Sequence, residues 1–360
     1  MTALRNYVTI IISLPFLTGC APRVATSFWR IGTPADSARD GYTVIHAEGK
    51  TRHCYPITEW TSTDEKEDVY HQLHHHGVAV ENELMAYRIY FDKKQTIDPY
   101  CKRTPQLELA QSYWYPNDSL LAAGYGDDIL RVSGTVGVGS VKYWDGKLRH
   151  IENVAQRSQR ILKQQKDQAT IEVADYGWIV EGKQENISVQ YTLMAGDRHM
   201  RCDVYTTDPL EGLCTGVQTI PAKGGWPTDT IILSDGTIGL GKDSQLSILN
   251  CQLENGILLA SWGTDWPVND SAKYAKETVG LAVFIPKEFA GALVHDKSNN
   301  LCLLKQEKKR YFLDRKKFFY SHYTAHFYLT CCGATKEDHP VARNATEWYN
   351  YLRRWAKKLK

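Results

Sequence analysis

Three turn dipeptides constrain the fold of this chain more than any other feature of its sequence. Asp145-Gly146, Asp235-Gly236 and Asn255-Gly256 each adjoin short runs rich in β-branched and aromatic residues. Asp-Gly and Asn-Gly pairs favour the tight turns that join neighbouring antiparallel strands. Further runs of the same character lie at 170–180 and 322–331. The sequence therefore predicts an antiparallel all-β protein, built as a large β-sandwich.

The composition favours one large domain over residues 28–360. Hydrophobic residues make up 42% and aromatic residues 11% of the 360 residues, which suits a sizeable core. We find no internal repeat, low-complexity block or interdomain linker in the sequence. The formal net charge is only +2, so the charge balance does not favour nucleic acid as a partner.

The first 20 residues have the pattern of a lipoprotein signal peptide. Arg5 supplies the positive start, an apolar run follows, and Leu17-Thr18-Gly19-Cys20 matches a lipobox. The apolar run is too short to span a membrane. We expect Cys20 to carry the lipid, residues 21–27 to form a tether, and the protein to be anchored in the cell envelope. Because Ala21 follows the cysteine, the outer membrane is the expected site, on its periplasmic or its surface face.

Eight further cysteines follow Cys20 in the chain. An oxidising periplasm permits disulfides, but the sequence does not indicate which thiols would pair. Buried free thiols are the alternative, because a domain of this size does not need disulfide bonds. The eight residues are Cys54, Cys101, Cys202, Cys214, Cys251, Cys302, Cys331 and Cys332.

Two segments have helical character. Residues 153–166 form a polar and ambiguous run. Residues 346–360 space Trp348, Leu352 and Trp355 along one face, with basic side chains around them. We expect this C-terminal helix to dock its apolar face on the sandwich, with contact to anionic lipid as an alternative.

The stretch from His74 to Lys102 concentrates the side chains capable of chemistry. From Met85 to Phe91 apolar residues alternate with Ala86, Arg88 and Tyr90, so a strand would place Arg88 and Tyr90 on one face. Glu81 and Glu83 would fall on the apolar face if the register were unbroken. Buried unpaired carboxylates are costly, so we expect a bulge or bend near Leu84.

The same stretch could also be purely structural. In that case His74, His75 and His76 would lie in a polar turn, and Arg88 would pair with a carboxylate. A metal site is not favoured, because adjacent histidines point in different directions and no His-Glu-x-x-His or paired Cys-x-x-Cys completes a ligand set. The sequence indicates neither a metal nor a cofactor.

A second group of candidates lies further along the chain. His322 and His326 share one strand face by period 2, and either face of that strand could look inward. Trp178 and Trp266 are candidates for stacking on sugar rings, and Trp266 is favoured because glycine and proline place it in a loop. Asp265 precedes Trp266 and joins it as a candidate for substrate binding.

Several motifs together carry a family resemblance. They are the lipobox, the His-His-Gly at 75–77, and the segments 81–92, 175–178, 262–267 and 277–286. With these motifs the chain resembles the domain-of-unknown-function family numbered 4861, found in polysaccharide-utilisation loci and sometimes fused to unsaturated uronyl hydrolases. The likeness covers most of the mature chain. A glycine usually precedes the lysine of the first block, whereas Cys101 precedes Lys102 here.

The resemblance implies a galactose-mutarotase-like super-sandwich whose concave sheet face binds sugars. Uronic-acid polymers are often cut by β-elimination, which needs a cation for the carboxylate, a base for the C5 proton and an acid for the leaving oxygen. Arg88 would be the cation, His75 or His76 the base, and Tyr90 the acid. The sequence thus predicts a carbohydrate-active lipoprotein that acts on uronic-acid-containing oligosaccharides.

Three alternatives remain open at the level of the sequence. Glu81 and Glu83, two apart on a strand, could be the carboxylate pair of a glycoside hydrolase. Epimerisation at C1 needs only one acid and one base. A non-catalytic glycan-binding lipoprotein would need aromatic and hydrogen-bonding groups but no titrating histidine.

Overall fold

The structure is a computed structural model that describes residues 23–32, 43–47, 50–221, 230–232, 238–240, 246–268, 271, 274–312 and 319–359. The described strands form four sheets, and the pairings between them are antiparallel. The predicted all-β sandwich with a C-terminal helix is therefore confirmed. Cys20 and the signal peptide lie outside the described residues.

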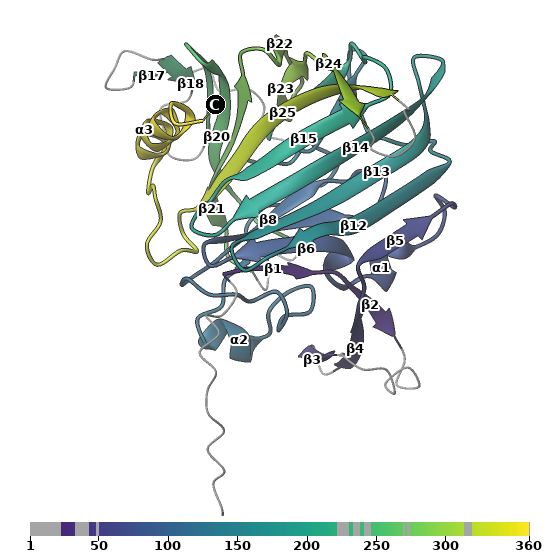
Figure 1. The fold of residues 1–360 in the computed structure, drawn as a ribbon. Helices are drawn as coiled ribbons and strands as arrows, with labels where there is room; N and C mark the ends of the chain where they lie inside the picture. Colours follow the sequence, from purple (N-terminus) through teal and green to yellow (C-terminus); the bar gives the residue numbers. More distant parts are fainter. Residues whose placement is uncertain are drawn as a thin grey trace, which may run out of the picture.

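The largest sheet has twelve strands and forms the broad layer seen in front in Figure 1. In spatial order they are β17 (Thr230–Ile232), β18 (Ile238–Leu240), β19 (Leu246–Leu253), β20 (Gly256–Asp265), β21 (Glu277–Pro286), β25 (Phe319–Gly333), β15 (Met200–Thr206), β14 (Lys183–Met194), β13 (Gln168–Val180), β12 (Gln156–Gln164) and β5 (Glu59–Ser62), while β24 (Glu307–Phe312) pairs with β25.

A five-stranded sheet packs against the middle of this layer and carries the candidate site. It consists of β1 (Val24–Ser27), β6 (Gly77–Asn82), β7 (Met85–Tyr90), β8 (Ile97–Cys101) and β9 (Asp127–Asp128). Tyr87 and Ile89 of β7 share one apolar core with Val204 and Phe327 of the large sheet. Arg88 alternates with these residues and therefore lies on the outer face of the five-stranded sheet.

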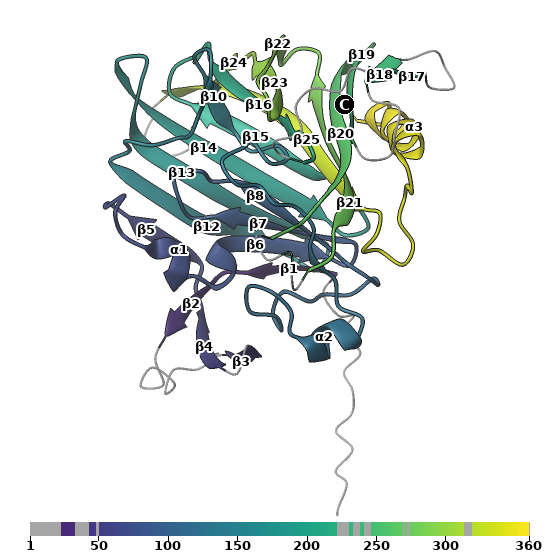
Figure 2. The same ribbon diagram turned by 180° about the vertical axis from the view of Figure 1, so that it is seen from behind.

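Two further sheets contain the remaining described strands, and both can be followed in the reverse view of Figure 2. One contains β11 (Leu148–Arg149), β10 (Lys142–Trp144), β16 (Leu213–Gln218), β23 (Asn299–Leu304) and β22 (Ala290–His295). The other contains β2 (Trp29–Gly32), β4 (Lys50–Pro56) and β3 (Thr43–Ala47), and it projects from the sandwich beside α1.

Helices are few and short among the described residues. They are α1 (Val69–Gln72), a 3-10 turn at His74–His76, α2 (Asp118–Ala122) and α3 (Ala345–Ala356). No helix in the described part of the chain is both long and apolar enough to cross a membrane.

The predicted C-terminal helix is confirmed. The side chain of Asn344 caps α3 by accepting from the backbone N–H of Glu347. Trp348, Leu352 and Trp355 are buried in a second apolar core, against residues of β20 and β21. Figure 1 shows this helix lying beside these two strands.

The expected turns are located at two of the three dipeptides. Asp145-Gly146 joins β10 to β11, and Asn255-Gly256 joins β19 to β20. The turn at Asp235-Gly236 lies outside the described residues, although β17 and β18 on either side of it are paired.

Two local predictions were wrong. Residues 153–166 do not form a helix, because 156–164 pair as β12 between β5 and β13. The expected tether over 21–27 does not extend to Ser27, because Val24–Ser27 form β1 and pair with β6. In both segments sheet pairing outweighs local composition.

The eight cysteines after Cys20 are buried free thiols, so the alternative without disulfides is the one found. The bend expected near Leu84 is the turn between β6 and β7. That turn shifts the register, so Glu81 pairs with Ala86 and joins the outer face instead of the apolar face.

Candidate functional site

The candidate site is the polar outer face of the five-stranded sheet β1-β6-β7-β8-β9. The register sets Arg88 opposite Asp98, and Tyr100 opposite Asp128. Side chains at directly opposed positions project from the same face of a sheet, so these residues meet. The predicted shared face of Arg88 and Tyr90 is thus confirmed. Unlike an open face, it is covered, and Arg88 is only 1% exposed.

Arg88 is at the centre of a buried ionic cluster. Its Nη2 lies 2.5 Å from Asp98 Oδ2 and 2.8 Å from Asp128 Oδ2. Its Nη1 donates to the backbone carbonyl of Trp114 at 2.6 Å, and the ring of Tyr115 lies 5.7 Å from its Cζ. The sequence predicts that Arg88 binds the carboxylate of a substrate. In the structure both terminal nitrogens of Arg88 already have oxygen partners within the protein.

Tyr90 is a further member of this cluster. Its hydroxyl donates to Asp98, and the residue is 8% exposed. Burial and the neighbouring Asp98 raise the pKa of Tyr90 well above its usual value. Burial, together with Asp98, likewise raises the pKa of Asp128. A raised pKa favours the protonated form of both groups, and a protonated group can act as a proton donor.

Further along the same face lies a second buried pair. Lys102 contacts Glu81, which also accepts from the backbone N–H groups of Glu108 and Leu109 at 2.8 and 3.0 Å. The ring of Tyr100 lies 5.8 Å from both Arg88 Cζ and Lys102 Nζ, so it separates the two clusters. Lys102 is therefore engaged even though Cys101, and not glycine, precedes it.

The expected carboxylate pair for hydrolysis does not form. Glu81 is buried beside Lys102, whereas Glu83 lies in the turn after β6 and pairs with Arg23 near the surface. The turn at 83–84 breaks the strand geometry that would have set the two carboxylates side by side.

The three histidines bind backbone carbonyls. His74 Nε2 donates to Ser112 at 2.7 Å, His75 Nε2 to Leu109 at 2.9 Å, and His76 Nδ1 to Tyr70 at 2.9 Å. A carbonyl only accepts, so each of these ring nitrogens carries the proton.

Burial is the main reason why all three histidines stay neutral. It lowers the pKa of His74 to about 4 and that of His76 to about 3, and it holds the pKa of His75 well below its usual value. His75 is fully buried, so it is not placed to take a proton from a substrate. His76 is 7% exposed and is the better placed of the two predicted bases.

The backbone at this point is unusual. His75 and His76 have φ values of 55° and 61°, in the left-handed region. Gly77 follows with φ 155°, and a Cβ there would lie 2.1 Å from the carbonyl oxygen of Ile89. Strain of this kind gathers at sites where the surroundings dictate a backbone course.

Aromatic rings form a ridge beside the buried clusters. His76 stacks on Tyr70 at 3.8 Å and on Trp114 at 4.3 Å, and Trp114 stacks on Tyr113 at 4.5 Å. We call Tyr70, His76, Tyr113 and Trp114 the aromatic ridge. Tyr90 meets it through Tyr70, with ring centres 5.3 Å apart. Sequence reasoning missed Tyr113 and Trp114, although the run Tyr-Trp-Tyr at 113–115 was a usable signal.

The buried side chains hold the ridge in place. His74, His75, Arg88 and Glu81 all bind backbone groups of one segment, 108–114. That segment carries Tyr113 and Trp114. The ionic clusters therefore position this stack of rings, in which His76 and Tyr113 are buried and Tyr70 and Trp114 are half-buried, in addition to any chemistry of their own.

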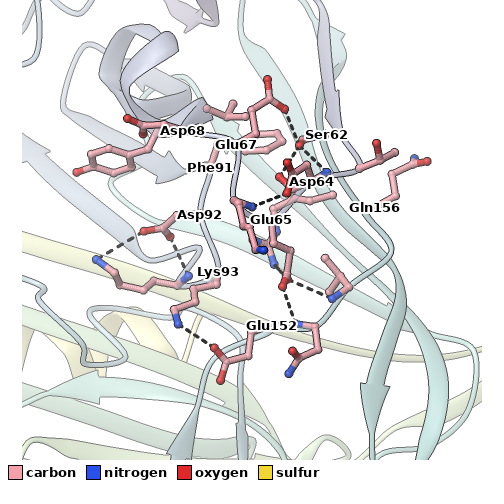
Figure 3. A pocket seen from close by; sticks show the side chains of 18 residues that line it. Ser62, Asp64, Glu65, Glu67, Asp68, Phe91, Asp92, Lys93, Glu152 and Gln156 are labelled. Atoms are coloured by element: carbon pink, nitrogen blue, oxygen red, sulfur yellow. Dashed lines mark hydrogen bonds and ion pairs between the residues drawn. The ribbon is translucent and has the colours of Figure 1, made fainter.

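A pocket of about 630 Å³ borders the ridge at Tyr70 (Figure 3). Its walls come from the stretches 62–70, 91–94 and 152–157. Lys93 spans it to Glu152 at 2.9 Å, as Figure 3 shows. Six carboxylates line the pocket against four lysine or arginine side chains, so its charge does not favour an anionic sugar.

The second predicted patch is not part of this site. His322 and His326 alternate with Phe327 and Leu329 of the core, so they lie on the outer face of the twelve-stranded sheet. Arg88 lies on the outer face of the opposite sheet, with the core between them. Trp178 is 3% exposed and belongs to the core, so it is not available for stacking on a sugar.

Trp266 and Asp265 lie where β20 ends. The Asp265 side chain accepts from the backbone N–H of Trp266 at 2.8 Å, and Lys276 Nζ lies 4.3 Å from the Trp266 ring centre. Tyr274, two residues before Lys276, contacts the ring of Tyr115 at 6.2 Å. Tyr274 therefore contacts a ring that itself lies beside Arg88.

No group of three or more His, Cys, Asp or Glu side chains in the described ranges is arranged to hold a metal ion. The described side chains of the site, Arg88, Asp98, Tyr90 and His76, are suited to hydrogen bonding and proton transfer.

Together these features define an antiparallel β-sandwich protein with a buried ionisable network beneath an aromatic surface. The chain belongs to the family described as a domain of unknown function, DUF4861, whose model matches residues 33–360. No curated protein matches the sequence. Among solved structures, the chain is similar to a galactose mutarotase related enzyme from Lactobacillus acidophilus, at 12% identity and a TM-score of 0.26, over 72% of this chain and 98% of that one.

Proposed function

We propose that this protein is a carbohydrate-active lipoprotein of the cell envelope that acts on uronic-acid-containing oligosaccharides. One observation carries the proposal: the Tyr90–Asp98–Arg88 cluster adjoins the aromatic ridge, which in turn borders a pocket large enough for sugar units. Aromatic rings beside a few buried polar groups are the usual composition of a sugar-binding site.

The substrate class rests on the family context and on the charges. Polysaccharide-utilisation loci and fusion to unsaturated uronyl hydrolases imply uronic acids. The pocket bordered by Tyr70 has more carboxylates than cations, so a neutral sugar unit suits it better than a uronate. The uronate would therefore lie on the ridge side of Tyr70.

Elimination is the chemistry that we propose. Tyr90 is the group that donates a proton to the leaving oxygen, because its hydroxyl is held by Asp98 and its ring lies beside Tyr70 and His76 of the ridge. Arg88 then acts as a positioning residue that fixes Asp98 and the Trp114 backbone. His76 lies 5.8 Å from Tyr90, ring centre to ring centre. Its Nδ1 donates to the Tyr70 carbonyl, so Nε2 of the neutral ring carries no proton and would take the C5 proton of the uronate.

Glycoside hydrolysis is the second candidate, favoured by one observation. Asp98 and Asp128 both contact Nη2 of Arg88, so the two carboxyl groups are close neighbours, and burial raises the pKa of Asp128. One ionised and one protonated carboxyl is the arrangement that glycosidases use.

The test is to incubate the purified chain with oligosaccharides of galacturonate, glucuronate, mannuronate and guluronate. Elimination produces ultraviolet absorbance from the unsaturated product, and hydrolysis produces new reducing ends without that absorbance. Saturable binding without either product would indicate the non-catalytic alternative. Absence of both binding and turnover across the panel would refute the proposal.

A matched pair of variants tests the assignment of Tyr90. Tyr90→Phe should abolish turnover and keep binding. Tyr143→Phe is the control, because its hydroxyl also donates to a carboxylate, Glu181 at 2.6 Å, but away from the ridge. Equal turnover of Tyr90→Phe and wild type would remove Tyr90 from the proposed site.

A further inference from the structure

The proposed substrate carries a carboxylate, and the cluster around Arg88 has no place for it. Nη1 of Arg88 is bound to the Trp114 carbonyl, and Nη2 to Asp98 and Asp128. A third carboxylate beside these two aspartates would meet repulsion in a buried setting. Recognition of a uronate therefore needs a cation elsewhere along the ridge.

Arg52 is a cation at the far end of the ridge. It belongs to β4 of the three-stranded sheet and is half-buried. Its guanidinium carbon lies 5.1 Å from the ring centre of Tyr113. No ion pair involves Arg52 within the described ranges, in contrast to Arg88.

The ridge connects Arg52 to the proposed reaction centre without a break. From Arg52 the contacts run to Tyr113, then to Trp114 at 4.5 Å, and then to His76 at 4.3 Å. His76 contacts Tyr90, whose hydroxyl is bound to Asp98. An oligosaccharide that lies along the ridge therefore extends from the phenol of Tyr90 toward the guanidinium of Arg52, with more than one sugar unit between them.

The chemistry of Arg52 suits a carboxylate. A guanidinium that lies over an aromatic ring keeps its N–H groups in its own plane, where they can bind both oxygens of a carboxylate. The ring also restricts the side chain, so less freedom is lost on binding.

We propose that Arg52 binds the carboxylate of the uronate unit and thereby makes the site selective for acidic glycans. The inference rests on the proposed function, because it identifies the specificity residue of the same site. The three-stranded sheet β2-β4-β3 then contributes recognition, while the five-stranded sheet contributes the reacting groups.

The test compares two ligands on matched variants. Uronate oligosaccharides and the same oligosaccharides with their carboxyl groups reduced to alcohols are titrated by calorimetry. The variants are Arg52→Ala, Arg52→Lys and the control Arg30→Ala. Arg30 stands on β2 of the same sheet, and its guanidinium lies 5.4 Å over the ring of Trp60, outside the ridge.

Arg52→Ala should raise the Kd for the acidic ligand by about tenfold or more and leave the Kd for the reduced ligand unchanged. Arg52→Lys should retain part of the affinity, because the charge stays but the bidentate geometry is lost. Arg30→Ala should bind like wild type. Thermal melts of each variant show whether the fold is kept.

Two results would overturn the inference. One is an acidic-ligand Kd for Arg52→Ala equal to that of wild type, and the other is an equal loss for both ligands. If wild type binds neither ligand, the proposed function itself fails, and the inference fails with it.

Discussion

Replacing Arg88 by alanine tests whether its buried charge holds the site together. Asp98 and Asp128 would lose their shared cation while remaining 0% and 4% exposed. Removing one partner of a buried ion pair typically costs about 3–5 kcal/mol, because the remaining charge is left without compensation. A domain is typically stable by about 5–15 kcal/mol, so the variant should fold but unfold at markedly lower urea concentration.

The pH dependence of this loss has a definite sign. Burial already raises the pKa of Asp128, and without the opposing charge of Arg88 that pKa should rise further. A carboxyl with a raised folded pKa stabilises the native state at low pH, and this stabilisation is lost as pH rises through the folded pKa. The deficit of Arg88→Ala relative to wild type should therefore shrink as pH falls from 8 to about 5. The neutral histidines destabilise both proteins on acidification. The charge of Arg88 is one of the causes that lower their pKa values, so its removal weakens this effect in the variant and shrinks the deficit in the same direction.

Urea unfolding followed by tryptophan fluorescence measures both quantities. Arg103→Ala is the matched control, because Arg103 Nε lies 3.2 Å from Asp338 Oδ1 and the two side chains are 50% and 45% exposed. That variant should change stability by no more than about 1 kcal/mol, with little pH dependence. If Arg88→Ala also loses under about 1 kcal/mol, or if its deficit does not shrink in acid, the assignment of a buried ionic cluster is wrong.

Four further predictions follow from other parts of the chain. Cys20→Ala should move the protein from the membrane to the soluble fraction; unchanged fractionation would contradict lipidation. Burial lowers the pKa of Lys142 to about 7, so wild-type stability should rise relative to Lys142→Met as pH increases from 7 to 10, and a constant difference would contradict a buried amine. Trp348→Ala should lower the free energy of unfolding in urea by about 3–5 kcal/mol, because this side chain of α3 is fully buried against β20 and β21. Limited proteolysis of residues 28–360 should yield no two separately folded fragments, since one sandwich domain is expected there.

The contacts of Arg88 change how its effect on activity should be interpreted. Arg88 binds the Trp114 carbonyl as well as two aspartates, so Arg88→Ala should disturb the ridge and reduce turnover without any direct contact with substrate. Arg52→Ala should leave stability nearly unchanged and alter only the affinity for acidic ligands. These different responses separate a positioning residue from a specificity residue.

Part of the site could be predicted because strand geometry is local. The alternation around Arg88 and Tyr90 placed both on one face, and the register confirms it. The same reasoning failed for His75, which lies inside a 3-10 turn, has a left-handed φ and is fully buried. It also failed for Trp178, because alternation does not reveal whether a large ring lies in the core.

The sequence by itself determined the antiparallel sandwich and the C-terminal helix. Turn dipeptides act on adjacent residues, and a helix face repeats every few positions, so both signals lie within a short segment. Residues 156–164 had no such clear signal, and pairing on both sides made them a strand.

Only the tertiary structure decided what covers the outer face of the five-stranded sheet. Arg88 meets Asp128 from 40 residues away, and His75 meets Leu109 from 34 residues away. The segment 108–114 turns an apparently open sheet face into a buried network and brings Tyr113 and Trp114 beside His76. Such contacts depend on long-range packing, which the period of a single strand does not encode, so the aromatic ridge and its link to Arg52 emerged only from the folded chain.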